Sequence, residues 1–506
     1  MKKRISALLL LLSLLLSLCA CGRGPGIEEL IAQGRRLYYG EDSEDAMPEL
    51  EKAKMAFLEC DGESAEALYF LGRIAEAQKN AVKARGYYEK ASEMGSALAL
   101  LALGEMYFHG KGIKTDRAKA AELFEQALDA GCSEAYCGQA DMYRFGYGEA
   151  ANAELAIAYY KRALDGKETE WRAYAYASIG DVCLDMLGKY KEALSNYERA
   201  AEFNNPHAYG ALGYMYKEGL GVEIDNDKAF SYLERAETFE QQPAGYYLGW
   251  MYEKGLGTEV DLGKAIALYE EAAAAGQGAA YNQLGCLYLS GTGVTADAAR
   301  AAECFQSGAE LGCADAYYNL GWVYANIEGI EDDDAAVVSC YENAALLGNL
   351  DAYYALVPLY MNGIGTSVAP DKAFSCLMTL SETEDPTVFT ALAWMYMQGV
   401  GVETDYALAR SYAEDALSLG DETAAYVIGM LYENGWGMDY RNVYTAIRYY
   451  IRAAEADVAD ACYAVGRMYE TGTGTKADRE SALEYYRQAV DLGNEEAVKA
   501  VARLGG

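Results

Sequence analysis

Side chains capable of acid–base or metal chemistry are scarce in this chain, whereas aromatic side chains are plentiful. Only two histidines, His109 and His207, occur among 506 residues, against 45 tyrosines and 5 tryptophans. A metal site bound by several histidines, or a Ser-His-Asp triad, therefore has almost no residues from which to be built. Carboxylates are abundant, but nothing in the sequence brings a particular pair to a cleft, as a glycosidase would require. We expect no catalytic residue, no metal site and no cofactor.

The one motif with a specific chemistry lies in the first 26 residues. Three basic residues at positions 2–4 precede an apolar run, Ile5 to Leu18, which is short for a membrane span and typical of a signal peptide. The run ends in Leu18-Cys19-Ala20-Cys21-Gly22, which resembles the lipobox of bacterial lipoproteins. The resemblance implies a signal peptide over residues 1–20, and a lipidated Cys21 with a short tether over residues 21–26. A plain secretory peptide or an uncleaved anchor remains the alternative.

These features predict a protein of the bacterial cell envelope that is extracytoplasmic and lipid-anchored to a membrane. The formal net charge is −35, from 42 basic and 77 acidic residues. So acidic a surface repels phosphate backbones, which argues against a nucleic-acid partner and favours a basic one.

Ten cysteines lie beyond the leader, and their spacing is irregular. They are Cys60, Cys132, Cys137, Cys183, Cys286, Cys304, Cys313, Cys340, Cys376 and Cys462. Export permits disulfides, yet only Cys132 with Cys137 and Cys304 with Cys313 are close in sequence. We expect one or two bridges, with most of the cysteines serving as small buried hydrophobes.

An internal repeat organises the rest of the chain. An aliphatic residue followed by a small residue returns at a period of 36 between Gly213 and Gly429, and less regularly before and after. The period predicts a degenerate helical cap unit over 27–66, divergent repeats over 67–211, and regular repeats with a C-terminal cap over 212–506. The pairs are Leu71-Gly72, Leu103-Gly104, Gln139-Ala140, Ile179-Gly180, Leu212-Gly213, Leu248-Gly249, Leu284-Gly285, Leu320-Gly321, Leu356-Val357, Leu392-Ala393, Ile428-Gly429 and Val465-Gly466.

Each repeat reads as two helices. In one copy, apolar residues recur at helical spacing from Ala244 to Lys254, and Gly255-Leu256-Gly257 ends that helix. Asp261 then stands where its carboxylate can cap a second helix, predicted over Leu262 to Ala275. A recurrent tyrosine four residues after the aliphatic position is interpreted as core.

The repeat pattern resembles the Sel1-like repeat, a relative of the tetratricopeptide repeat with a longer inter-helix loop. Its elements are A-x-x-x-L-G-x-x-Y-x-x-G-x-G and D-x-x-x-A-x-x-x-Y-x-x-A-A-x-x-G. A lone helical pair cannot bury its apolar face, so the units must stack. The expected fold is all-α, an α/α superhelical solenoid of about twelve helical hairpins. The resemblance implies a concave side lined by the first helix of each hairpin.

The tetratricopeptide pattern also implies which positions face that groove, namely two residues before and two after the aliphatic residue. In the later repeats these positions are largely aromatic, and Trp250, Trp322 and Trp394 share one of them at intervals of 72 residues. The candidate ligand-binding residues are Tyr214, Tyr246, Trp250, Tyr318, Trp322, Tyr354, Trp394, Tyr426, Met430 and Tyr463. Packing of these side chains on neighbouring repeats is an equally weighted alternative.

We therefore hypothesise a non-catalytic extracytoplasmic scaffold that binds a peptide or protein segment through its concave face. One alternative is a cell-wall-related enzyme like the cysteine-rich branch of Sel1-like proteins, which is linked to penicillin binding and β-lactamase activity. The absence of regular cysteine pairs and of a Ser-x-x-Lys motif disfavours it. A passive surface spacer is the other alternative, although a spacer would not need an aromatic groove.

Overall fold

The computed structural model describes residues 27–39, 50–60, 62–147, 150–239, 244–330, 333–437 and 440–505. Cys21 and the rest of the expected signal peptide and tether lie outside these residues. Within them the chain forms 27 helices and no strand, and none of these helices is long and apolar enough to cross a lipid bilayer. The helices divide into two compact units, the first ending at Val260 and the second beginning at Asp261.

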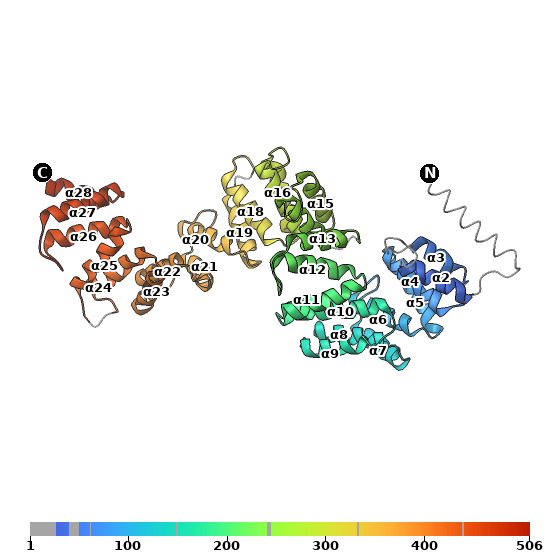
Figure 1. Cartoon of the computed structure of the whole chain (residues 1–506). Helices are drawn as coiled ribbons and strands as arrows, with labels where there is room; N and C mark the ends of the chain where they lie inside the picture. The colour runs from blue at the N-terminus through green and yellow to red at the C-terminus, as the bar shows by residue number, and fades with distance from the viewer. Residues whose placement is uncertain are drawn as a thin grey trace. The chain divides into compact units, whose positions relative to one another are not determined.

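In the first unit, helices pair in sequence order into hairpins, from α2–α3 to α12–α13, and each hairpin packs on the next (Figure 1). A 3-10 turn, Ser133–Ala135, precedes α8, and a π-helical turn, Val182–Met186, follows α10. The helices are α2 Ile27–Tyr39, α3 Leu50–Leu58, α4 Ala65–Ala77, α5 Ala81–Glu93, α6 Ala97–His109, α7 Arg117–Asp129, α8 Tyr136–Arg144, α9 Ala153–Ala163, α10 Thr169–Asp181, α11 Tyr190–Glu202, α12 Pro206–Glu218, α13 Asn226–Glu237 and α14 Ala244–Lys254.

The second unit continues the pattern from α15, through hairpins α16–α17 to α26–α27, to the terminal helix α28. Pro358 lies inside α20, which has 13 residues. The helices are α15 Leu262–Ala274, α16 Gly278–Ser290, α17 Ala298–Glu310, α18 Ala314–Asn326, α19 Asp334–Leu346, α20 Leu350–Asn362, α21 Pro370–Leu380, α22 Pro386–Gln398, α23 Tyr406–Ser418, α24 Ala425–Asn434, α25 Val443–Glu455, α26 Ala459–Thr471, α27 Arg479–Asp491 and α28 Glu495–Gly505.

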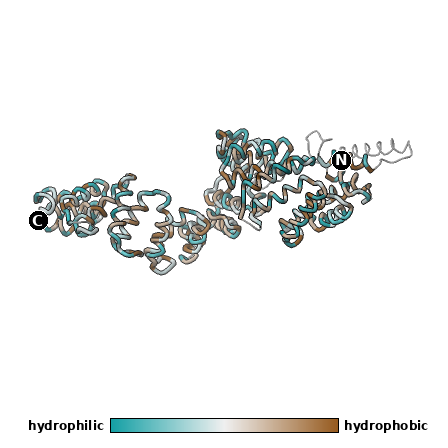
Figure 2. The backbone as a smooth tube through the Cα atoms, turned by 90° about the horizontal axis from the view of Figure 1, so that it is seen from below, coloured by the Kyte–Doolittle hydropathy of each residue, from teal (hydrophilic) through white to brown (hydrophobic). Residues whose placement is uncertain are grey.

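The repeated small residue allows an aromatic ring of the second helix to pack directly on the backbone of the first. A Cβ atom at Gly285 would lie 2.5 Å from the ring of Phe305, and Gly466 stands in the same relation to Tyr486. Both rings are buried, as are Tyr88, Tyr160 and Tyr450 at the same position of other hairpins. Hydrophobic and hydrophilic stretches alternate along the chain (Figure 2), as expected when each helix buries one face.

The recurrent tyrosine of the first helix is also structural. It stacks nearly parallel on a tyrosine of the second helix in several hairpins, as in Tyr396 on Tyr412 and Tyr432 on Tyr449, whose ring centroids are 5.7 Å and 5.8 Å apart. The interpretation of these tyrosines as core holds for Tyr216, Tyr288 and Tyr360, which are buried, whereas Tyr396 and Tyr432 are half-buried.

The loop between the two helices is fixed at both ends. Gly399 takes a left-handed conformation (φ 70°) and ends α22, and Asp405 caps α23 by accepting hydrogen bonds from the amides of Ala407 and Leu408 at 2.9 Å and 3.0 Å. The predicted cap at Asp261 is confirmed. Aspartates at the same repeat position also cap the second helices of other hairpins, so that the full set is Asp116, Asp225, Asp261, Asp297, Asp405 and Asp478.

The replacement Asp405→Ala should lower the local stability of the α22–α23 hairpin by about 1 kcal/mol, because two amides of the first turn lose their acceptor. Hydrogen–deuterium exchange of α23 measures this loss without assuming that the whole array unfolds in one step. Asp415→Ala, an exposed carboxylate at the other end of the same helix, is the control and should change exchange little. Equal exchange in the two variants would contradict the capping role.

The expectation of one or two disulfides is wrong for the part of the chain that the structure describes. None of the ten cysteines is in a disulfide within these residues, and seven of them are buried. Burial raises the pKa of Cys376 and Cys462 to about 11 and that of Cys132 to about 12. Cys132 and Cys137 lie in the core as small side chains.

Candidate binding stripe and a buried polar cluster

Seven of the ten predicted groove residues lie in the second unit, on the first helices of consecutive hairpins. Tyr318 and Trp322 are on α18, Tyr354 is on α20 and Trp394 is on α22, while α24 and α26 complete the set with Tyr426, Met430 and Tyr463. We call these seven residues the aromatic stripe. Trp322, Trp394 and Tyr354 are 40%, 41% and 37% exposed, and the other four are half-buried.

The tyrosines of the stripe have partners in the fold. Tyr318, Tyr426 and Tyr463 each pack against a tyrosine on the second helix of their own hairpin, with ring centroids 5.5 to 5.7 Å apart. Tyr354 donates a hydrogen bond of 2.7 Å to Asp385, the cap of α22. The packing alternative therefore accounts for part of the role of these tyrosines.

Trp322 and Trp394 differ from Trp250, the third tryptophan at the same repeat position, in what lies against the indole ring. In the first unit the ammonium of Lys217 lies 4.4 Å from the centroid of the Trp250 ring. Leu289 and Met361 occupy the position of Lys217 in the hairpins preceding Trp322 and Trp394. Within the described residues, no cation and no aromatic ring packs on Trp322 or Trp394, and at 40% and 41% exposure part of each side chain is accessible to a partner.

The three predicted groove residues of the first unit form a packed group instead of an open surface. Tyr214 and Tyr246 both contact Tyr247, with ring centroids 5.4 Å and 5.2 Å away, and Lys217 covers Trp250. None of the three is more than partly exposed.

In the earlier hairpins the position two residues after the aliphatic residue carries charges, which the structure buries. Arg73 pairs with Glu76 at 3.6 Å and with Glu170. Asp181 accepts a hydrogen bond from Tyr197 and lies beside Arg144 and His207. A series of buried polar clusters therefore replaces the aromatic stripe here.

One of these clusters brings Glu105 and His109 of α6 against Asp141 of α8. The Nε2 atom of His109 lies 3.3 Å from a carboxylate oxygen of Glu105, and one ligand atom from each of the three residues lies within 4.8 Å of the others. Asp141 is wholly buried and accepts hydrogen bonds from the hydroxyls of Tyr160 and Tyr174. Burial, and next the charge of Glu105, raise the pKa of Asp141 to about 7.

This cluster was not predicted from the sequence. His109 is the last residue of α6 and shares a helix face with Glu105, four residues earlier. The sequence carried one indication of the cluster, because Glu105 and Asp141 occupy the same position in adjacent repeats.

A cavity of about 670 Å³ opens beside this cluster within the first unit. It lies where α2 and α4 meet the beginning of α10. Tyr39 donates to Glu168 at 3.2 Å, and the indole of Trp171 donates to the hydroxyl of Tyr69 at 3.4 Å. Its lining includes Arg73, Glu105, Trp171, Tyr174, Phe203 and Phe239.

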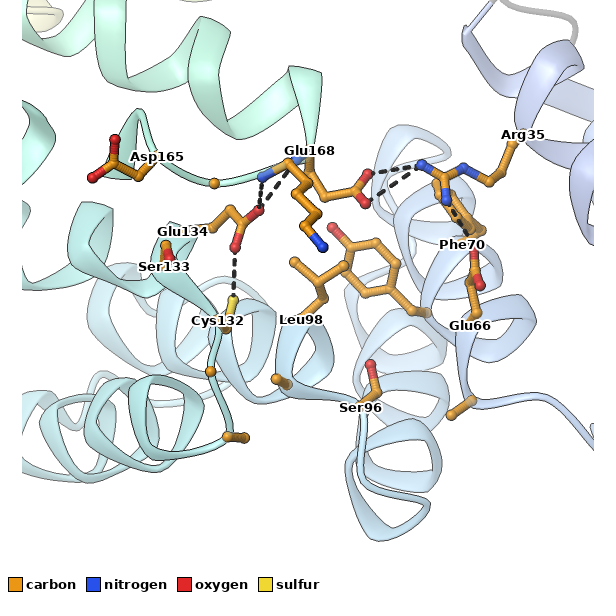
Figure 3. Close-up of a pocket in the computed structure, with 17 residues that line it drawn as sticks. Arg35, Glu66, Phe70, Ser96, Leu98, Cys132, Ser133, Glu134, Asp165 and Glu168 are labelled. Carbon is orange, nitrogen blue, oxygen red and sulfur yellow. Dashed lines mark hydrogen bonds and ion pairs between the residues drawn. The ribbon is translucent and has the colours of Figure 1, made fainter. Parts of the chain in front are cut away.

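Figure 3 shows a smaller cavity nearby, of about 440 Å³, in which Glu134, Arg35, Glu66 and Glu168 have partners within the protein. Glu134 accepts hydrogen bonds from the backbone amides of Lys167 and Glu168, at 2.8 Å and 3.1 Å, and Cys132 donates to its other oxygen (Figure 3). Arg35 spans Glu66 and Glu168 at 3.0 Å and 3.2 Å. These contacts fix the turn before α10 and pair Glu134, Arg35, Glu66 and Glu168 within the protein.

Comparison with known proteins places these hairpins in context. A model described as the Sel1 repeat matches residues 65–96, 97–132, 133–167, 206–237, 243–277, 278–313, 314–349, 351–377, 390–421, 423–458 and 459–494. The crystal structure of c5321, a protective antigen of uropathogenic Escherichia coli with an SLR fold, is 24% identical, covering 83% of this chain and 93% of that one, with a TM-score of 0.49. A Sel1 repeat protein from Oxalobacter formigenes is 30% identical, covering 48% of this chain and 99% of that one, with a TM-score of 0.43.

Proposed function

Because this chain belongs to the Sel1 repeat family, whose solenoids serve as protein-interaction scaffolds, we propose that it is a non-catalytic extracytoplasmic scaffold that binds a segment of a partner protein along the aromatic stripe. The observation that carries the proposal is the pair of partly exposed indole rings, Trp322 and Trp394. Tryptophan is the side chain most enriched among residues that dominate binding energy.

The spacing of the two tryptophans suits an extended peptide. They lie on α18 and α22, with one hairpin between them. Packed helices are roughly 8–10 Å apart, so the rings are separated by roughly 16–20 Å. An extended chain rises about 3.3 Å per residue, so about five or six residues reach from one ring to the other.

The charge around the stripe favours a basic segment. Asp315, Asp351 and Asp460 are exposed at the beginnings of α18, α20 and α26, and the whole chain carries a net charge of −35. Trp250 shows within this chain how a lysine packs on an indole at the same repeat position. A lysine or arginine of the partner would make that contact with Trp322 or Trp394.

The location is also part of the proposal. Signal-peptide features over residues 1–20 and the lipobox-like Cys21 support export and a lipid anchor at a membrane of the cell envelope. Labelling with a palmitate analogue tests it, with the expectation that Cys21→Ala abolishes incorporation and Cys19→Ala does not. Incorporation into Cys21→Ala would reject the assignment.

Peptide selection tests the binding role. The purified chain should enrich, from a random 12-residue library, peptides that contain lysine or arginine beside apolar residues. A selected peptide should bind the double variant Trp322→Ala/Trp394→Ala at least 100-fold more weakly, since a dominant binding residue contributes about 2 kcal/mol or more. Its affinity for the unmodified chain should fall as salt concentration rises.

Trp250→Ala is the matched control, because its ring is already covered by Lys217, and it should leave the affinity within about twofold. Helical circular dichroism should be the same in all variants, since both stripe tryptophans lie at the surface. Undiminished binding by the double variant would reject the stripe as the site, and failure to select any peptide would favour a passive spacer.

A further inference from the structure

The cluster of Glu105, His109 and Asp141 is a second site, distinct from the aromatic stripe. We propose that these three side chains bind one divalent transition-metal ion of the Zn²⁺ or Mn²⁺ class. This inference does not depend on the proposed scaffold function, because it concerns different residues of the first unit.

The arrangement of the donor atoms is close to that of a metal site. In a tetrahedral site with metal–ligand distances of about 2.0–2.1 Å, neighbouring ligand atoms are roughly 3.3–3.4 Å apart. His109 Nε2 and Glu105 Oε2 are 3.3 Å apart, and the donor atoms of all three residues lie within 4.8 Å of one another.

The electrostatics of the cluster call for a cation. The second carboxylate oxygen of Glu105, Oε1, is buried and has no hydrogen-bond partner. The wholly buried Asp141 lies beside it, so two carboxylates share a region of low dielectric constant with a single imidazole. Burying one unpaired carboxylate is costly, and burying two next to each other adds their mutual repulsion. A divalent ion removes both costs.

The surrounding fold holds the donors in place and leaves a route of entry. Tyr160 and Tyr174 donate hydrogen bonds to the two oxygens of Asp141, as outer groups commonly do for a ligating carboxylate. The side chain of His109 is 31% exposed, and Glu105 lines the cavity of about 670 Å³. An ion can therefore reach the cluster, and its remaining coordination positions can hold water.

The donor types favour a transition metal over calcium or magnesium. One imidazole nitrogen with two carboxylate oxygens suits Zn²⁺ and Mn²⁺, whereas Ca²⁺ and Mg²⁺ prefer oxygen ligands alone. The other histidine–aspartate pair of the chain, His207 with Asp181, already has a cation, because Arg144 lies 3.0 Å from Asp181. That pair has no need of an ion and serves as an internal comparison.

Isothermal titration calorimetry of the EDTA-treated chain with ZnCl₂ and MnCl₂ tests the site. One ion should bind per chain with at least one of the two metals, and MgCl₂ and CaCl₂ should bind at least tenfold more weakly. His109→Gln and Glu105→Gln should each weaken binding at least tenfold. Co²⁺ should give a visible absorption band with the unmodified chain that His109→Gln removes.

His207→Gln is the matched control and should bind the ion as the unmodified chain does. Circular dichroism separates loss of the site from loss of the fold, and His109→Gln, being partly exposed, is the variant that should keep the fold intact. The proposal is overturned if no saturable binding of one Zn²⁺ or Mn²⁺ occurs. It is equally overturned if both variants, correctly folded, bind with unchanged affinity.

Discussion

Replacement of Gly401 by alanine is expected to destabilise the α22–α23 hairpin by about 3 kcal/mol or more, one of the largest effects of any single methyl group in this chain. Gly401 has φ at +72°, and a left-handed conformation costs alanine about 1–2 kcal/mol. A Cβ atom there would also overlap the carbonyl oxygen of Pro370, which belongs to the backbone of the preceding hairpin and cannot rotate away. Strain and steric overlap therefore add.

Gly420→Ala separates these two causes. Gly420 also has a positive φ, +99°, but no atom lies within 4 Å of the position of its Cβ. It should therefore show the conformational cost alone, about 1–2 kcal/mol. Hydrogen–deuterium exchange of α21, α22 and α23 measures both variants locally. If Gly401→Ala proves no more destabilising than Gly420→Ala, direct contact of the loop with the preceding hairpin is not what holds consecutive repeats together.

The Gly401 contact shows why so much of the fold could be predicted from sequence. The second glycine of each Gly-x-Gly loop recurs because each hairpin meets the last one through the same backbone contact, as at Gly365 on Asp334 and Gly474 on Val443. A local sequence pattern that repeats in register therefore determines both the fold of each hairpin and its packing on the next hairpin. The helix predicted from Ala244 to Lys254 has the bounds of α14. The helix predicted from Leu262 to Ala275 begins with α15 and ends one residue after it.

The candidate sites were harder to predict, because they depend on differences between repeats. Trp250, Trp322 and Trp394 are equivalent in the repeat, but Lys217 packs on the first, whereas Leu289 and Met361, which carry no charge, stand at the position of Lys217 before the other two. Sequence alone does not show which side chain of one hairpin reaches the next.

The buried clusters of the first unit could not be predicted for a related reason. Contacts of α2 and α4 with α10 join residues more than 90 positions apart, such as Arg73 with Glu170, and no periodic pattern reports such a contact. Aspartates at groove positions are ordinarily solvated, so nothing in the sequence indicated that Asp141 and Asp181 would be buried.

Among the side chains of these clusters, Asp181 is the one whose removal should lower the free energy of unfolding most. Its carboxylate, 12% exposed, accepts a hydrogen bond of 2.7 Å from Tyr197 and lies 3.0 Å from Arg144, whose side chain is 19% exposed. It also lies 2.7 Å from His207. Asp181→Ala leaves the guanidinium of Arg144 largely buried without its counter-ion, a change that costs about 3–5 kcal/mol in buried pairs. Glu125→Ala, which removes an exposed carboxylate from the same unit, should cost little.

The loss caused by Asp181→Ala should depend on pH in a defined direction. Burial alone would raise the pKa of Asp181, but the hydrogen bond and charge of His207, the charge of Arg144 and the hydrogen bond from Tyr197 together lower it. The hydrogen bond to Asp181 raises the pKa of His207 against the effect of burial, with a further contribution from nearby Asp185.

Stability from the lowered pKa of Asp181 is complete above its unfolded value, about 3.9, and is lost as pH falls through the folded value. Stability from the raised pKa of His207 is complete below about 6.5 and is lost as pH rises through its folded value. The difference in local unfolding free energy between the unmodified chain and Asp181→Ala, measured by exchange in α10 and α11, should therefore be largest between about pH 4 and 6.5. A difference that stays level above about pH 6.5 would show that the histidine does not take part.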